Sequence, residues 1–215
     1  MPLNRFRLPP KGTLIPSNSD DPLRYYYLPL VGRLYVSRIN IATGLIQNQF
    51  FEKTLEIGYG SGVLIPTLSK ISDEVYGVDL QSNPETVSQL LAKLDCYPKL
   101  SYGVPDRLLF DDNTFDLIVA ISVLEHIKEI RSFLEEIHRV LKPGGQLLVG
   151  MPAVNKFMDY LFQAIGFSGI EAHHVMSPEE MSLASQGLFK LEKSAHMPGF
   201  LPSNTYLYKS FCFRK

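Results

Sequence analysis

The sequence predicts an α/β protein built on a parallel sheet. From residue 53 to residue 151, short apolar runs alternate with amphipathic stretches, which is typical of parallel strands joined by right-handed crossovers. The run Leu117–Val119 is continuously apolar, as expected for a strand that is buried on both faces. Glycines directly follow the first run, so this strand is predicted to end in a tight turn.

The composition suits one ordinary domain with a buried core. The chain has 215 residues, of which 45% are hydrophobic and 20% charged, and this excludes a disordered or coiled-coil chain. Its 21 basic and 22 acidic residues argue against a protein whose whole surface binds nucleic acid.

The sequence also shows no sign of a metal site or a membrane anchor. The two cysteines, Cys96 and Cys212, lack a metal-ligand spacing. No apolar run reaches the ~20 residues of a membrane-spanning helix and no targeting signal is evident, so we expect a soluble, cytoplasmic protein.

The elements before residue 53 are predicted to form an arm and a helical lid. Residues 1–22 contain five prolines among small polar residues, which indicates an irregular arm. Residues 25–50 are apolar with helical spacing, which favours a helix or a helix pair.

Residues 53–151 are predicted to form the core of the sheet. The alternating pattern places strands at 54–57, 75–78, 99–102, 115–121 and 146–151, and helices at 62–70, 83–94 and 127–141. The second helix opens with a capping-box spacing and a first-turn proline.

Residues 152–215 are predicted to contain a cover and two closing strands. Residues 155–165 have a helical pattern, and Ser177 and Glu180 form a second capping box before a short helix at 178–186. Residues 189–193 and 205–211 alternate apolar with polar, which favours an antiparallel hairpin at the edge of the sheet. We therefore expect one domain with three parts, residues 1–52, 53–151 and 152–215.

The segment most informative about chemistry is the glycine loop, residues 58–62. Gly58, Gly60 and Gly62 follow a strand and open a helix, so the backbone can turn tightly and approach a ligand closely. Such a loop alone is weak evidence, because a turn can need glycine for steric reasons. Asp79 ends the next strand about 20 residues later, where nucleoside sites place the acid that binds the ribose.

Two neighbouring residues distinguish between nucleoside cofactors. Val63 stands where a nicotinamide motif has its third glycine. Glu56 precedes the glycines, where a carboxylate would repel a pyrophosphate but attract an ammonium group. S-adenosylmethionine has an ammonium group and no phosphate, so the pattern favours this cofactor.

At this point the sequence resembles the class I S-adenosylmethionine-dependent methyltransferases, particularly the small-molecule group with type 11 methyltransferase domains. Five motifs in the family's order carry the resemblance: Glu56-Ile-Gly58-Tyr-Gly60-Ser-Gly62, Val75-Tyr-Gly77-Val-Asp79, Phe110-Asp-Asp-Asn-Thr-Phe115-Asp116-Leu-Ile-Val, Val123-Leu-Glu125-His126-Ile and Arg139-Val-Leu-Lys142-Pro143-Gly144-Gly145. The resemblance implies a Rossmann-like seven-stranded sheet, mostly parallel with an antiparallel terminal strand and with helices on both faces. The cofactor would lie at the carboxyl ends of the first, second and fourth strands.

The resemblance also assigns roles by position. The residues expected to bind the cofactor are Glu56, Gly58, Tyr59, Gly60, Gly62, Asp79, Leu80, Asp106 and Ser122. Glu56 and the glycine loop would hold the methionine end, and Ser122 would lie near the transferable methyl group together with Leu124, Glu125 and His126. Where the family often has Gly-Asp-Ala, this chain has Gly103-Val104-Pro105 followed by Asp106. Either Asp106 substitutes from a shifted loop, or backbone and apolar contacts alone hold the adenine.

The candidates for an acid–base role are three histidines. Methyl transfer from a sulfonium is an in-line displacement of an already activated group, so a general base is optional. His126 follows the fourth strand, and its alternative role is that of an ordinary helix N-terminal residue. His173 and His174 precede the cap at Ser177, where the family commonly covers the acceptor, and their alternative is a solvated loop. Metal ligation by this pair is not expected, because adjacent residues rarely aim at one ion.

The acceptor is expected to be a small molecule. After the fourth strand the chain lacks an Asn/Asp-Pro-Pro-Tyr element and a Pro-Cys nucleophile, which disfavours nucleic-acid acceptors. Tyr26, Arg33, His126 and His174 are the residues expected to bind it. Residues 22–51 are basic, rich in tyrosine and free of acids, so this lid could recognise an acidic or aromatic acceptor or rest on a membrane beside a lipid-linked one. The alternative is a cap whose arginines lie in water.

We therefore expect S-adenosylmethionine-dependent methyl transfer to an oxygen, nitrogen or carbon nucleophile of a small molecule. One alternative is a catalytically silent S-adenosylmethionine-binding domain with a regulatory or interaction role. Another is a nicotinamide-dependent oxidoreductase, against which Glu56 and Val63 argue.

Overall fold

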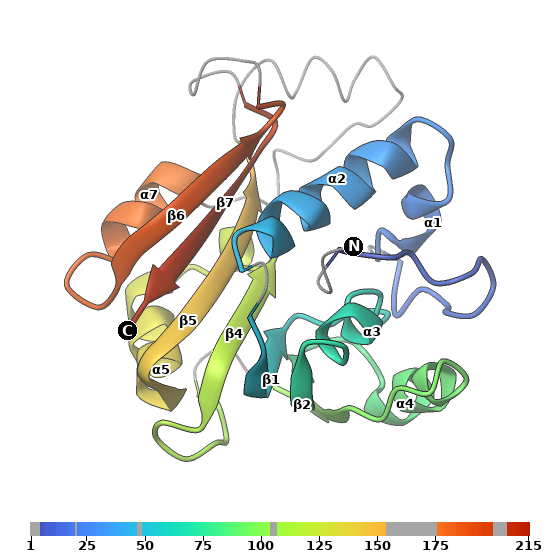
Figure 1. Cartoon of the computed structure of the whole chain (residues 1–215), viewed down its shortest axis with the longest axis horizontal. Helices are drawn as coiled ribbons and strands as arrows, with labels where there is room; N and C mark the ends of the chain where they lie inside the picture. Colours follow the sequence, from blue (N-terminus) through green and yellow to red (C-terminus); the bar gives the residue numbers. More distant parts are fainter. Residues whose placement is uncertain (1–4, 20, 47–48, 104–106, 154–175, 200–205) are drawn as a thin grey trace.

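A single seven-stranded sheet organises the protein (Figure 1). The structure is a computed structural model, and it describes residues 5–19, 21–46, 49–103, 107–153, 176–199 and 206–215. The strand order is β3-β2-β1-β4-β5-β7-β6. The strands are β1 Phe51–Ile57, β2 Ser72–Asp79, β3 Lys99–Tyr102, β4 Phe115–Ile121, β5 Leu141–Pro152, β6 Lys190–Met197 and β7 Tyr208–Arg214.

The pairing directions confirm the predicted mixed sheet. Strands β1 to β5 pair in parallel, while β7 is antiparallel to both β5 and β6. The expected terminal hairpin is therefore present, with β6 at the edge. In this arrangement β1 and β4 are central neighbours, so their carboxyl ends open onto the same edge of the sheet.

Helices cover both faces of the sheet, as predicted. The helices are α1 Leu23–Tyr26, α2 Val31–Gly44, α3 Ile65–Leu68, α4 Pro84–Ala92, a 3₁₀ turn η1 Leu124–His126, α5 Ile130–Val140 and α7 Pro178–Ala184. One core cluster joins α2, α3 and α4 to the sheet, and the other joins α5 and α7 to it. Successive side chains of a strand point to opposite faces of the sheet. In β4, Leu117 and Val119 therefore belong to the first cluster, and Ile118 and Ala120 to the second.

Several boundaries differ from the sequence prediction for identifiable reasons. The helix expected at 62–70 is reduced to the short α3. Gly58, Gly60 and Gly62 all have positive φ, whereas the residues of a right-handed helix have negative φ.

Two of the predicted helix starts are capped by side chains. Asn83 caps α4 by accepting from the Thr86 amide. The capping box of Ser177 and Glu180 is formed as predicted. The helix expected at 155–165 lies outside the described residues.

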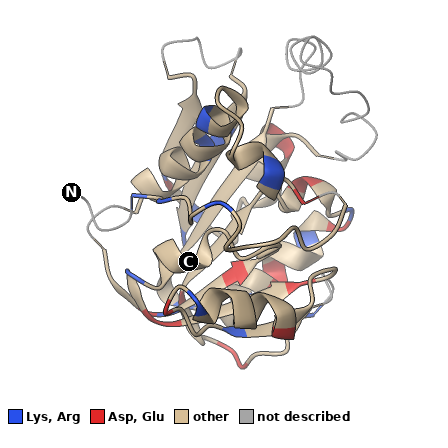
Figure 2. Ribbon diagram, turned by 90° about the vertical axis from the view of Figure 1, so that its right-hand side faces the viewer, with Lys and Arg blue, Asp and Glu red and all other residues tan. Residues whose placement is uncertain are grey.

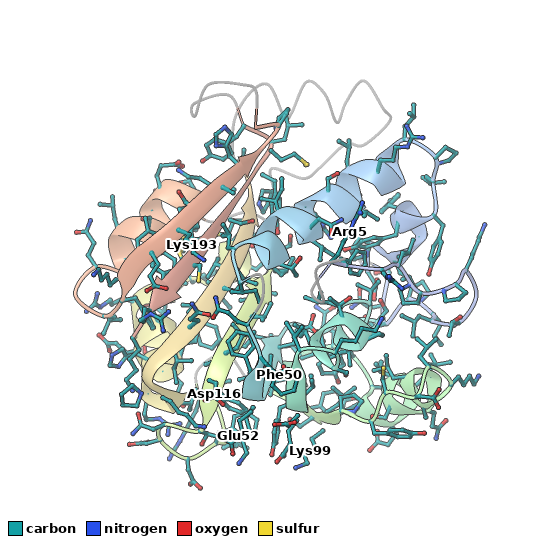
Figure 3. The ribbon with its side chains drawn as sticks, viewed as in Figure 1. Arg5, Phe50, Glu52, Lys99, Asp116 and Lys193 are labelled. Atoms are coloured by element: carbon teal, nitrogen blue, oxygen red, sulfur yellow. The ribbon has the colours of Figure 1, made fainter. Side chains whose placement is uncertain are left out.

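The two ends of the parallel strands have different characters. Figure 3 shows Phe50, Glu52, Asp116 and Lys99 at the lower end of the sheet, where β1, β3 and β4 begin. Lys142 pairs there with Glu52 at 2.8 Å and with Asp116 at 3.0 Å. These ion pairs link β5 to β1 and β4. The glycine loop and the carboxyl ends of β1, β2 and β4 lie at the other end.

Candidate cofactor and active site

The glycine loop after β1 has a conformation that only glycine accepts readily. Gly58, Gly60 and Gly62 have φ of +74°, +52° and +77°. A Cβ atom on Gly58 would lie 2.3 Å from Cγ2 of Val123, the residue that begins the turn after β4. The loop therefore brings the ends of β1 and β4 into direct contact.

Asp79, at the end of β2, holds this loop in place. Its Oδ2 accepts a 2.9 Å hydrogen bond from the Gly60 amide, and its Oδ1 accepts from the amides of Gln81 and Ser82 at 2.8 Å each. Each carboxylate oxygen has two lone pairs, so Oδ2 retains acceptor capacity for a ligand hydroxyl. Leu80 follows with 54% of its surface exposed and offers an apolar surface beside the acid.

Glu56 is a buried carboxyl with an unsatisfied oxygen. The residue is only 5% exposed, and its Oε2 has no hydrogen-bond partner among the described residues. Burial, followed by the nearby Asp79 carboxylate, raises the pKa of Glu56 well above its usual value. A buried orphan oxygen of this kind is costly unless a ligand satisfies it. A cationic donor would satisfy it best.

A second polar cluster lies at the ends of β4 and β7 and contains Arg38 of α2. Nη1 of Arg38 donates to Ser122 Oγ at 3.3 Å, and Nη2 donates to Tyr26 Oη at 3.0 Å. Ser122 Oγ and Tyr208 Oη form a further hydrogen bond of 3.0 Å. The guanidinium also lies over the Tyr35 ring, 4.2 Å from its centroid. An arginine from the amino-terminal lid is thus fixed against the fourth strand.

The Arg38 cluster carries a positive charge. In the described part of the chain Arg38 makes no ion pair, and its buried Nε has no hydrogen-bond partner. The nearby Glu125 is 1% exposed, and burial raises its pKa to about 8, although its own backbone amide and Arg38 oppose this shift. At neutral pH Glu125 is therefore largely protonated while Arg38 remains charged. The cluster is suited to an anionic ligand.

Ser122 itself has an unusual backbone conformation. Its φ is +57°, which is rare for a residue other than glycine and often marks a functional position. Its amide donates to Gly150 O at 2.7 Å. The ring of Tyr208 fits beside Ser122 because Gly150 has no side chain. A Cβ atom on Gly150 would lie 2.6 Å from Tyr208 Oη.

The amino-terminal arm lies over the glycine loop. Asp21 is 7% exposed; its Oδ1 accepts from the Leu23 amide at 2.8 Å and from Ser61 Oγ at 3.4 Å. Its Oδ2 accepts from the amide and hydroxyl of Ser17. A Cβ on Gly60 would lie 3.5 Å from Asp21 Oδ2. The arm therefore covers the loop and shields it from water.

The structure places the other predicted residues as follows. Tyr59 is 2% exposed with its ring against Gly77, so its backbone is the part left to face a ligand. His126 is exposed on η1, Tyr26 is buried against Arg38, and Arg33 is exposed. Asp106, His173 and His174 lie outside the described residues, and their roles stay predictions.

Three residues of the site escaped the sequence reasoning, namely Arg38, Tyr208 and Asp21. Arg38 was one of three arginines in the lid, and nothing in the sequence alone distinguished it from Arg33. In the structure Arg38 lies one turn before the buried Ala42, on the inner face of α2, and this packing distinguishes it from Arg33. Tyr208 and Asp21 are brought to the site only by the sheet pairing and the path of the arm.

No group of three or more metal-ligating side chains occurs among the described residues. In the same residues, no helix has the length and apolar character needed to cross a membrane.

The fold is the Rossmann-like fold of solved methyltransferase structures. Residues 55–149, somewhat under half of the chain, match the model of the family described as "Methyltransferase domain", and this match supports the predicted class I S-adenosylmethionine-dependent methyltransferase. It is 27% identical over 157 residues to a ubiquinone biosynthesis O-methyltransferase of Colwellia psychrerythraea, a match that covers 72% of this chain and 61% of that protein. The chain thus spans somewhat less than two thirds of this relative.

Solved structures share the fold at low sequence identity. The N-methyltransferase NodS from Bradyrhizobium japonicum, in complex with S-adenosylhomocysteine, aligns with a TM-score of 0.64 and 17% identity, over 92% of this chain and 93% of that one. The [4+2]-cyclase SpnF aligns with a TM-score of 0.64 and 16% identity, over 86% of this chain and 80% of that one. The predicted seven-stranded sheet with an antiparallel terminal strand is confirmed by the strand pairing and agrees with this likeness.

Proposed function

We propose that this chain binds S-adenosylmethionine between the glycine loop and the Arg38 cluster and transfers its methyl group to an oxygen nucleophile of a small molecule. The observation that carries the proposal is a pair of buried, unsatisfied groups of opposite kind, Glu56 Oε2 and Arg38 Nε. Glu56 lies near the carboxyl end of β1, and Arg38 of α2 lies against the end of the neighbouring β4, where it donates to Ser122.

The residues present fit the charges of this cofactor. Its amino-acid end has one ammonium and one carboxylate on the same carbon, and Glu56 and Arg38 are the matching partners. Asp79 would receive the ribose hydroxyls, and Leu80 would contact the adenine. When bound, S-adenosylmethionine supplies a methyl group on a sulfonium, which is already activated for displacement.

The chain's own residues then have mainly to align the acceptor and exclude water. The arm held by Asp21 covers the glycine loop. Ser122 and Tyr208 present hydroxyls at the end of β4, where they could orient an acceptor oxygen. The proton of the acceptor hydroxyl needs a destination, and His126, which is exposed on η1, is the candidate that follows Ser122 along the chain.

The oxygen nucleophile is favoured by the relatives' names, since the matched curated proteins are ubiquinone biosynthesis O-methyltransferases. A second candidate is a cofactor-binding domain without methyl transfer. SpnF shares this fold and is named as a cyclase, not as a methyltransferase, and this favours the second candidate.

The test has two stages. Calorimetric titration with S-adenosylhomocysteine and with NAD should give binding of the first alone. The Asp79→Ala variant should lose this binding, whereas Asp73→Ala, on the exposed opposite end of β2, should keep it. Tight NAD binding without S-adenosylhomocysteine binding would refute the proposal.

Transfer is then measured with radiolabelled S-adenosylmethionine and a panel of catechols and hydroxybenzoates. Label in an ether product supports the O-methyltransferase. Binding of the cofactor without transfer to any member of the panel, or to amine and thiol acceptors tested in parallel, favours the second candidate.

A further inference from the structure

An exposed apolar corner lies between α1 and α2. Leu28, Leu30 and Leu34 are 46%, 76% and 41% exposed, and Pro29 between the first two is exposed as well. Figure 1 shows this corner at the margin of the molecule, away from the sheet. Single exposed leucines are ordinary, but several adjacent ones are typical of a binding surface.

The corner is held rigidly by its backbone. The Gly32 amide donates to Leu28 O at 2.8 Å. A Cβ on Gly32 would lie 2.2 Å from Tyr26 O, so glycine lets α2 begin tightly against α1. The leucines are thus presented on a fixed turn, and little ordering is needed when they bind.

The exposed charges of the N-terminal segment that carries the corner are basic. We define the N-terminal cap as residues 5–46. Its exposed charged residues in the described part of the chain are all cationic, namely Arg5, Arg7, Lys11, Arg24 and Arg33 (Figure 2). Asp21 is the one described acid of the cap, and it is buried. The near-neutral chain therefore concentrates positive charge on the part that carries the exposed leucines.

The opposite side of α2 is already occupied. Ile39 and Ala42 are buried against the sheet, Arg38 points to Ser122, and Lys193 of β6 donates to Leu45 O at 2.9 Å. Figure 3 shows Lys193 close to the carboxyl end of α2. The helix is fixed on the body by one face, and the corner at its other end remains available.

We propose that the N-terminal cap docks on the surface of an anionic lipid membrane, with Leu28, Leu30 and Leu34 inserted among the acyl chains and the arginines on the headgroups. Basic residues near an anionic surface and apolar side chains at its boundary act together in this way. A nucleic acid would use the cations but would leave the leucines in water. The inference is independent of the proposed function, because it concerns the outer side of the cap.

The test is co-sedimentation with vesicles of equal parts phosphatidylcholine and phosphatidylglycerol, compared with phosphatidylcholine alone. We expect binding to the anionic vesicles only, weakened by high salt. Arg24→Glu should weaken it about fivefold or more, because each basic residue near the surface contributes on the order of a fivefold gain. Leu30→Asp should weaken it by about tenfold, because it places a charge among apolar groups.

The matched control is Leu109→Asp, since Leu109 is 84% exposed and lies outside the cap. It should bind vesicles as the wild type does. The melting temperature and S-adenosylhomocysteine affinity of each variant report on folding separately. The proposal is overturned if the wild type does not co-sediment with anionic vesicles, or if Leu109→Asp weakens binding as much as Leu30→Asp does. A dimer that Leu30→Asp dissociates, without vesicle binding, would assign the corner to self-association instead.

Discussion

Arg38 and Ser122 are separated by 84 positions in the sequence, yet Arg38 Nη1 donates a 3.3 Å hydrogen bond to Ser122 Oγ. This contact joins the amino-terminal lid to the carboxyl end of a central strand. It makes the lid part of the site and places a half-buried cation there.

Replacing Arg38 with Ala should raise the dissociation constant for S-adenosylhomocysteine about 10- to 100-fold, because a hydrogen bond to a charged group contributes ~1.5–3 kcal/mol. Arg38→Lys should lose less, since it keeps the charge. Calorimetry measures both. Arg33→Ala, at an exposed position of the same helix, is the control and should bind the cofactor normally. Equal losses in the two alanine variants would contradict a specific role for Arg38.

Cofactor binding should tighten as the pH rises. Burial raises the pKa of Glu56, so the carboxyl of the free protein is protonated over a wider pH range, whereas an ammonium ligand favours its ionised form. Binding should therefore release a proton, which calorimetry in buffers of different ionisation enthalpy detects. Glu56→Gln should bind more weakly and without this proton release. A pH-independent affinity in the wild type would remove Glu56 from the ammonium site.

Glu125 should make the protein progressively less stable as the pH rises from 4.5 to about 8. Its pKa is raised from 4.5 to about 8 by burial, so its stabilising contribution is complete below pH 4.5 and is lost as the pH rises towards 8. The loss could reach about 5 kcal/mol, at 1.36 kcal/mol per unit. Urea denaturation across this range should show a smaller decline in Glu125→Gln than in the wild type. Parallel curves would indicate that Glu125 is ionised in the folded protein.

Two glycines with similar backbone angles should respond differently to alanine. Gly58 and Gly144 have φ of +74° and +77°, but a Cβ on Gly58 would meet Val123 at 2.3 Å, whereas Gly144 has nothing within 4 Å. Gly144→Ala should cost about 1 kcal/mol from backbone strain, and Gly58→Ala about 3 kcal/mol because overpacking is added. Urea denaturation compares them. If the two variants lose equal stability, the contact between the turns after β1 and β4 is unimportant.

Much of the fold was predictable because its signals are local. Alternation of apolar runs identified β1 to β5, and the Ser177 capping box identified α7. The start of α3 was misplaced because the same glycines that signal a turn were also assumed to open a helix. Glu56 and Asp79 were identified from their spacing, since both lie at strand ends whose neighbours are fixed by the parallel order.

The sequence by itself determined the fold class, the position of the glycine loop and the two acids beside it, because short-range periodicity and glycine conformation specify these features. Only the tertiary structure decided which arginine of the lid faces the site, since Arg33 and Arg38 differ by little more than one helical turn and their exposure depends on how α2 packs on the sheet. The same holds for Tyr208 and Asp21. Their contacts with Ser122 and Ser61 cross from distant segments, and long-range packing has no local pattern in the sequence.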